Sequence, residues 1–255
     1  MRETQQIRLL QALIFVGAIA LWEGGVRLGL INPFWTSSPA MLLQAFVSSL
    51  AENNITFHLG VTLSEALSGL AVGALAGIAL GLLLGMSRIV GLALEPFIVA
   101  LNSLPRVALA PLIVMFVGIG FASKFLLAFS LVVVPMMINT WEGIKSVDIV
   151  QLNLMKVLKA NRWQLFAKVL LPNCIPWLFS GLRVSLSFAI IGAIVGEFIS
   201  ARAGIGFMMD EAAGGFDTTG MLMPLFVLMI VSFALDRVLL AVSSYYLHWR
   251  QQPAH

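Results

Sequence analysis

Long apolar stretches without charge constrain the fold of this chain most strongly. From residue 66 to residue 86 no side chain is charged, and a helix of that length crosses the roughly 30 Å of hydrocarbon in a bilayer. Over the whole sequence 60% of the residues are hydrophobic and only 11% are charged, whereas soluble domains carry about 25% charged residues. The sequence therefore predicts an all-α, polytopic membrane helix bundle.

Six apolar segments are long enough to be transmembrane helices, and we expect them to form one membrane domain that covers residues 1–255. They lie at about residues 9–30, 59–86, 89–117, 125–141, 181–200 and 221–247.

The basic residues indicate the orientation of these segments, because cytoplasmic loops are enriched in lysine and arginine. With the N-terminus inside, most basic residues, including Lys145 and Arg183, fall on the cytoplasmic side. The opposite side keeps Arg27, Lys124 and Arg202, accompanied by several acidic residues. We therefore expect both termini to be cytoplasmic.

The first apolar segment has an alternative interpretation as a signal peptide, since Ala18-Ile19-Ala20 resembles a signal-peptidase site. The apolar run continues beyond it through Trp22. Glu23 and Arg27 follow, spaced so that they can pair on one helix. We favour an uncleaved transmembrane helix.

The second segment carries a glycine at every fourth position, which lets another helix approach closely. Steps of four residues drift by about 40° each at 3.6 residues per turn. We expect this seam to wind around its helix, to touch more than one neighbour and to serve packing within the bundle. Its members are Gly69, Gly73, Gly77, Gly81 and Gly85.

The third segment is a candidate lining of a translocation pathway. Three prolines, Pro96, Pro105 and Pro111, interrupt it, and it places Asn102 and Arg106 at membrane depth. Broken helices with ionisable groups occur where the backbone faces protein or a water-filled cavity. In the alternative interpretation, Arg106 only holds helices together by pairing with Glu65 or Glu197. The candidate pathway residues are Asn102, Arg106, Asn139 and Glu197.

Residues 148–172 form a basic, amphipathic segment on the expected cytoplasmic side. No acid follows Asp148, while the segment contains Lys156, Lys159, Arg162 and Lys168. Asp148 with Gln151, and Asn161 with Gln164, fit helix-start patterns. We expect two short helices, at about residues 149–160 and 162–171, the second stopped by Pro172 and kept from resuming quickly by Pro176.

Each of these short helices has an apolar stripe, formed by Leu154, Val157 and Leu158 on the first and by Trp163, Phe166 and Leu170 on the second. Two partners fit a basic amphipathic surface of this kind: anionic lipid headgroups or a protein. We favour a protein, because a turn between two capped helices presents a protruding knob rather than one long interfacial face.

The run from Ala160 to Phe166, followed by Val169-Leu170-Leu171-Pro172, resembles the cytoplasmic "EAA" loop of permeases from binding-protein-dependent ABC importers. Other motifs are similar to the nitrate, sulfonate and taurine branch of that superfamily. They are PLIVMFVGIG at 111–120, Ser123-Lys124, NTWEG at 139–143, Ser146-Val147-Asp148, Gly196-Glu197 and Gly204-Ile205-Gly206.

The resemblance implies a subunit of the bacterial cytoplasmic membrane that pairs with a second copy of itself as a homodimer. The dimer would form the pathway for a small solute of the sulfonate, nitrate or heteroaromatic-precursor type. An extracytoplasmic binding protein would deliver the solute, and a separate ATPase dimer would bind ATP and Mg. The acidic, glycine-rich outer loop at 201–220 would contact the binding protein. In the alternative interpretation, this loop is only a flexible connection. The implied ATPase-coupling residues are Leu154, Val157, Leu158, Lys159, Ala160, Asn161, Arg162, Trp163, Gln164 and Phe166.

The chain departs from the family pattern in the coupling loop. Asn153, Leu154 and Met155 stand where the family has Glu-Ala-Ala, and Lys159 replaces its turn glycine. Lysine tolerates a positive φ poorly, so we expect the turn to shift to Asn161.

Several other classes of function are disfavoured by the sequence. It contains no G-x-x-x-x-G-K-[ST] motif that could cradle ATP, and its basic residues follow topology rather than a nucleic-acid-binding pattern. The histidines His58, His248 and His255 fall on expected loops and tails, which disfavours a membrane-embedded hydrolase. One cysteine forms no disulfide framework or cysteine-cluster metal site. We expect no cofactor or metal in this chain; the alternative function is a scaffold that anchors an ATPase for a separate substrate-capturing membrane protein.

Overall fold

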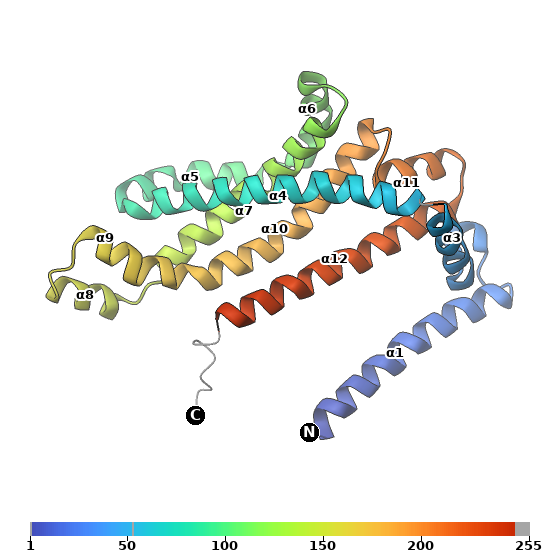
Figure 1. Ribbon diagram of the computed structural model, residues 1–255, viewed down its shortest axis with the longest axis horizontal. Coiled ribbons are helices and arrows are strands. Elements are labelled where there is room, and N and C mark those ends of the chain that lie inside the picture. Colours follow the sequence, from blue (N-terminus) through green and yellow to red (C-terminus); the bar gives the residue numbers. More distant parts are fainter. Residues whose placement is uncertain (1, 53, 248–255) are drawn as a thin grey trace.

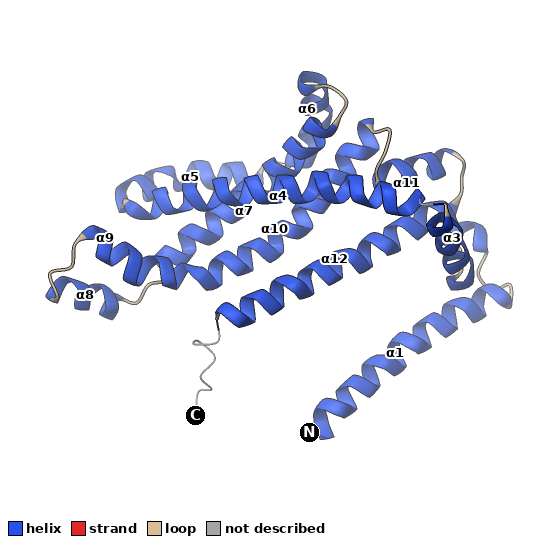
Figure 2. Ribbon diagram, in the orientation of Figure 1, coloured by secondary structure: helices blue, strands red, loops and turns tan. Residues whose placement is uncertain are grey.

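The computed structural model describes residues 2–52 and 54–247, and helices dominate this part of the chain (Figures 1 and 2). The His248 and His255 positions discussed above lie outside the described residues. The helices are α1 (Arg2–Arg27), α2 (Pro33–Thr36), α3 (Pro39–Ala51), α4 (Asn54–Met86), α5 (Arg88–Ser103), η1 (Arg106–Leu109), α6 (Ala110–Val117), α7 (Phe121–Lys145), α8 (Ile149–Val157), α9 (Arg162–Leu165), the π-helix η2 (Phe166–Leu170), α10 (Leu171–Ser200), α11 (Ile205–Gly214) and α12 (Thr218–Tyr246).

Five helices in the described residues are long and apolar enough to cross a membrane, and a bent pair makes up to six. The pair is Ile89–Ser103 and Arg106–Val117, whose axes differ by 72°. Its break lies at Leu104 and Pro105, as the proline pattern predicts, since proline has no N–H to donate and disfavours the α conformation in the residue before it.

The fifth predicted segment is longer than expected. One candidate span runs from Arg162 to Ser200, so neither Pro172 nor Pro176 ends the helix, and that prediction is wrong. Pro172 lies in the first turn of α10, directly after the wider turns of η2. Pro176 lies within α10, and interior prolines are tolerated in membrane helices where neighbouring groups satisfy the freed backbone.

Helices α4, α7 and α10 form the centre of the bundle, and α1 lies at its margin (Figure 1). The main buried cluster includes Ala66 and Ala74 of α4, Val132 and Met136 of α7, and residues of α10. None of the apolar stretch of α1 is buried. At the C-terminal end of α1, Arg27 Nε and Glu23 Oε1 pair at 2.6 Å, which confirms the pairing predicted from their spacing.

The two ends of the bundle differ in what they carry. Helices α8 and α9 lie at one end of its long axis, and α3 and α11 lie toward the other (Figure 1). The N-terminal end of α1 and the C-terminal end of α12 point away from the end of the bundle that carries α11 (Figure 1).

The glycine seam of α4 packs against one helix, not several. A Cβ at each of its five glycines would meet α7, at Ala128, Val132, Met136, Thr140 and Ile144 in turn. These residues of α7 also recur at every fourth position. The row of glycines on α4 and the row of contacts on α7 therefore wind by the same angle, and each glycine stays against α7. The prediction of more than one neighbour is therefore wrong, whereas the prediction of packing within the bundle is confirmed.

We predict that Gly77→Ala lowers the stability of the protein by about 1–3 kcal/mol, since overpacking a tight contact has this cost. The new methyl group would lie 2.6 Å from both Met136 Cβ and Val133 O. Gly60→Ala in the same helix is the matched control, because nothing lies within 4 Å of that position and alanine favours helix. Thermal unfolding in detergent measures both, and equal melting temperatures would contradict a rigid seam.

Candidate functional site: a protruding loop, a polar cleft and a buried carboxylate

The segment between α7 and α10 protrudes from one end of the bundle (Figure 1). Several of its apolar side chains are exposed. Val157 is 79% exposed and Trp163 is 73% exposed, and Leu154 and Leu158 are exposed as well. The Trp163 ring stacks on the Phe166 ring with centroids 5.7 Å apart. A group of exposed apolar side chains of this kind is typical of an interaction surface.

Local caps fix the two helices of this segment. Asp148 Oδ1 accepts a hydrogen bond from Val150 N at 2.8 Å. Asn161 and Gln164 form the predicted capping box, with Asn161 Oδ1 accepting from Gln164 N at 2.8 Å and Gln164 Oε1 accepting from Asn161 N at 2.9 Å. The first helix ends at Val157, a little earlier than predicted, and the second passes through η2 into α10 without a stop.

The turn between the helices lies at Lys159, not at Asn161. Lys159 has φ +52°, whereas Asn161 has φ −74° and serves as the N-cap of α9. The expected shift is therefore wrong. An asparagine in the extended conformation caps a helix well. Asn161 therefore stays extended as the N-cap of α9, and Lys159 adopts the left-handed conformation that the turn requires.

Asn173 braces the base of the protruding segment, a role that sequence reasoning missed. Its Nδ2 donates to Gly143 O and to Ser146 Oγ, each at 3.1 Å, and so ties the start of α10 to the end of α7. Nearby, Lys145 Nζ lies 2.9 Å from Glu142 Oε1 and 3.6 Å from Glu95 Oε1, which links α7 to α5.

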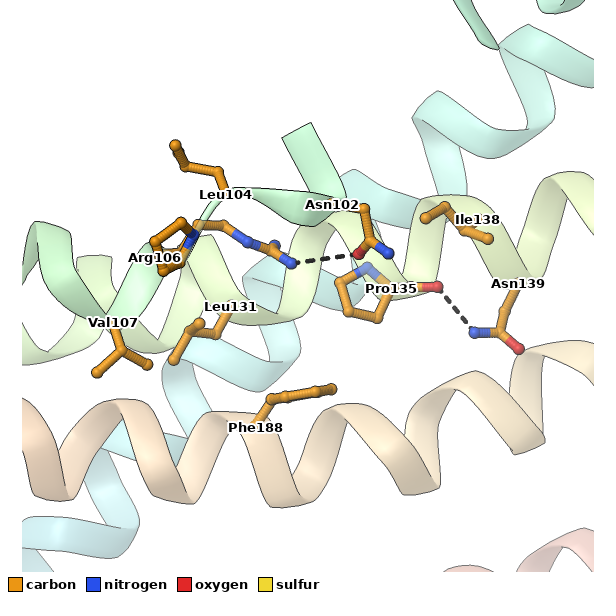
Figure 3. A pocket seen from close by; sticks show the side chains of 10 residues that line it. Asn102, Leu104, Arg106, Val107, Leu131, Pro135, Ile138, Asn139 and Phe188 are labelled. Carbon is orange, nitrogen blue, oxygen red and sulfur yellow. Dashed lines mark hydrogen bonds between the residues drawn. The ribbon is translucent and has the colours of Figure 1, made fainter. Parts of the chain in front are cut away.

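A cleft of about 470 Å³ lies where α5 breaks, between this break, α7 and α10 (Figure 3). It brings together three of the four candidate pathway residues, Asn102, Arg106 and Asn139, with Phe188 of α10 on the opposite wall. The nearby prolines Pro105 and Pro135 line it too. The fourth candidate, Glu197, does not line this cleft.

Arg106 is held in the cleft by neutral groups. Its Nη1 donates to Ser130 O at 2.7 Å, and its Nη2 lies 3.5 Å from Asn102 Oδ1. Its Nε is buried without a hydrogen-bond partner, and among the described residues it forms no ion pair with Glu65, Glu197 or any other carboxylate. Among the described residues the acid pairing of the alternative interpretation is therefore absent, and Arg106 contacts α7 through Ser130 O instead.

Glu197 is 1% exposed and belongs to a separate polar cluster at the end of the bundle that carries α11. Its Oε1 accepts from Thr62 Oγ1 at 2.7 Å and its Oε2 accepts from Gly206 N at 2.5 Å. Thr62 Oγ1 in turn accepts from Ile205 N at 2.7 Å. The carboxylate thus holds the first turn of α11 against α4.

The segment at 201–220 contains α11 and is not the flexible connection considered in the sequence analysis. His58 lies in α4 rather than on a loop, and its Nδ1 accepts from Gly204 N at 2.8 Å. Lys124 Nζ donates to Ser200 O, so the end of α10 is tied to α7 as well. The buried Glu65 and Lys124 lie beside Glu197, and sequence reasoning missed them because nothing local in the sequence marks them as neighbours.

We predict that Glu197→Ala loosens α11. The substitution leaves the buried Gly206 N–H without an acceptor, which costs about 1–3 kcal/mol. Hydrogen exchange of the amides at 205–214 should become faster than in the wild type, and Glu197→Gln, which keeps one carbonyl oxygen, should fall between. Glu52→Ala, at an exposed acid near the same end, is the control; unchanged exchange in Glu197→Ala would contradict the role of this carboxylate.

Comparison with known proteins identifies the family. Residues 73–244 match the family described as "Binding-protein-dependent transport system inner membrane component". The chain is 38% identical over 217 residues to the riboflavin transport system permease protein RibX of Chloroflexus aurantiacus, covering 85% of this chain and 81% of that protein. It is 34% identical over 197 residues to the putative aliphatic sulfonates transport permease protein SsuC of Escherichia coli, covering 77% and 75%.

The fold is also similar to a solved transporter. An inward-facing structure of the MetNI methionine ABC transporter superposes with a TM-score of 0.62 at 17% identity, covering 72% of this chain and 94% of that chain. At this identity the likeness concerns the fold alone. The family match, the curated relatives and the membrane helices lead to the same conclusion: the chain belongs to the permeases of binding-protein-dependent ABC importers, a family of multi-pass membrane subunits that are not themselves ATPases.

Proposed function

We propose that this permease carries a small anionic solute through a pathway lined by Asn102, Arg106 and Asn139, driven by a separate ATPase that docks on residues 148–172. The observation that carries the substrate class is Arg106, whose guanidinium lines the cleft without a carboxylate partner in the described residues. An unpaired charge is costly at membrane depth. A passing anion would offset that cost.

The cleft also offers groups that suit an anion with an organic part. Asn102 and Asn139 bear amide N–H groups, and Phe188 presents an aromatic ring on the facing wall (Figure 3). Among the similar proteins, the names of SsuC and TauC of Escherichia coli refer to aliphatic sulfonates and taurine. A sulfonate joins a full negative charge to a small carbon skeleton and is our first choice of substrate.

The proposed assembly contains two copies of this chain, an ATPase dimer that holds ATP and Mg, and a soluble binding protein on the outer side. We place it in the bacterial cytoplasmic membrane with both termini inside. All of residues 1–255 belong to one permease domain. The exposed apolar side chains of the protruding segment support docking of the ATPase. Burying an apolar surface that lies outside the transmembrane helices lowers the free energy, because that surface is removed from water.

We predict that Arg106→Gln lowers uptake of taurine or an alkanesulfonate at least about tenfold in proteoliposomes, because the positive charge in the cleft is lost. Arg106→Lys should retain part of the uptake. Arg202→Gln, at an exposed basic residue on the outer side, is the control. Uptake of riboflavin in preference to every anion, unaffected by Arg106→Gln, would contradict the anionic substrate.

We predict that Leu158→Asp and Trp163→Asp each reduce uptake to background while the protein still inserts in the membrane. A charge on the apolar surface would oppose its burial against the ATPase. Co-purification of a P-loop ATPase should be lost in both variants. Gln44→Glu adds a negative charge to an exposed polar position of α3, outside the protruding segment, and should leave uptake unchanged.

Retained uptake in both apolar variants would remove the protruding segment from the mechanism. The scaffold function would be favoured instead if uptake by the wild type required a further, substrate-capturing membrane protein in addition to the ATPase.

A further inference from the structure

A second polar cavity, of about 460 Å³, lies at the end of the bundle opposite α8 and α9, and the transport mechanism does not yet use it. Residues of α3, α4, α11, α12 and the turn between α11 and α12 line it, among them Ser49, His58, Glu211 and Asp217. This end faces the outside in the orientation proposed above.

The charge of the cavity is negative. Glu211 and Asp217 are both exposed, and neither takes part in an ion pair within the part of the chain that the structure describes. Asp217 is the N-cap residue of α12, yet its side chain makes no capping hydrogen bond, so the carboxylate is not committed to that helix. Two carboxylates that share one cavity and have no cationic partner favour binding of a cation.

Ser49 supplies an independent observation at the same cavity. The residue is 8% exposed, and its Oγ is a buried atom without a hydrogen-bond partner. Buried hydroxyls are nearly always hydrogen-bonded in folded proteins, so an orphaned one on the wall of a polar cavity calls for a donor or an acceptor in that cavity.

Hydrogen bonds hold part of the wall of the cavity in place, which suits recognition. Gly204 N fixes the His58 ring through Nδ1, and the ring stacks on Phe207 with centroids 5.9 Å apart. The turn after α11 is closed by hydrogen bonds from Gly215 N to Glu211 O and from Asp217 N to Ala212 O. A ligand would therefore meet groups that are already in place.

An exposed aromatic side chain stands beside the cavity. Phe216, between the two lining residues Gly215 and Asp217, is 77% exposed and has φ +56°. A bulky residue in the left-handed region is strained, and such strain is often found at functional positions. Aromatic side chains are enriched at protein interfaces, where they act as anchors.

We propose that this cavity is the docking point of the soluble binding protein and receives a lysine or arginine side chain from it, with Phe216 packing on the surface around that side chain. An ammonium or guanidinium group would pair with Glu211 and Asp217 and donate to Ser49 Oγ. The cation belongs to a partner rather than to the solute, because the solute proposed for the Arg106 cleft is an anion. The inference rests on the proposed function, since it assumes a binding protein on this side.

The test measures the dissociation constant between the transporter in nanodiscs, with its ATPase bound, and the binding protein that supports its uptake. Glu211→Gln combined with Asp217→Asn should raise the dissociation constant at least about tenfold. Asp210→Asn is the matched control, because Asp210 is an exposed acid of the same helix that does not line the cavity; its dissociation constant should stay within about twofold of the wild type. Binding to the wild type should weaken as salt rises, and the double variant should lose most of this salt dependence.

Equal effects of Asp210→Asn and the double variant, or an unchanged dissociation constant in the double variant, would overturn the cavity as the docking point while leaving the importer function intact. A lipid headgroup as occupant is the other outcome: loss of bound phosphatidylethanolamine in the double variant, with unchanged docking, would also overturn the proposal. A wild-type transporter that responds to no binding protein would overturn the proposed function and this site with it. Should the double variant fail to fold, the charge reversal Glu211→Lys is tested instead. It should weaken binding, and replacing the basic residue of the binding protein by an acid should restore binding only if the two side chains pair directly.

Discussion

Close contact between α4 and α7 supports the rest of the structure. Lipid is as apolar as a leucine side chain, so helices in a membrane associate through packing rather than through the hydrophobic effect. The glycines from Gly69 to Gly85 let α4 approach the backbone of α7 along four successive turns. Both polar centres depend on this contact. Helix α7 supplies Asn139 and Ser130 O to the cleft, and α4 supplies Thr62 to the Glu197 cluster.

Glu197 and Arg106 differ in how completely their polar atoms are satisfied. Both carboxylate oxygens of Glu197 accept hydrogen bonds, one from a hydroxyl and one from a backbone amide, although Oε2 of the neighbouring Glu65 is buried without a partner. Arg106 keeps a buried nitrogen without a partner and borders open space. A satisfied side chain stabilises one arrangement of helices, whereas an unsatisfied charge next to a cavity is suited to a transient ligand.

Features fixed by neighbouring residues could be predicted from the sequence, and features fixed by distant residues could not. The capping box of Asn161 and Gln164, the pair of Glu23 and Arg27, and the break at Pro105 each depend on a few consecutive residues. The Glu197 cluster joins α4, α10 and α11, and no local pattern brings Thr62 to Gly206. Two predictions that were based on neighbouring residues were nevertheless wrong. Lys159 adopts the left-handed turn because Asn161 is used as a cap, and Pro172 fits the first turn of α10 because η2 precedes it.

The longest helix connects the two ends of the molecule. From Arg162 to Ser200 the chain is helical throughout, about 58 Å at 1.5 Å per residue. Trp163 lies at one end of it and Glu197 at the other, while Phe188 faces the cleft between them. Only η2 and the turn at Pro176 interrupt regular α-helical bonding, so these are the places where the helix bends most easily. The proposed ATPase-docking segment, the cleft and the residue that holds α11 therefore lie along one continuous helix, and both of its interruptions lie between α9 and Phe188.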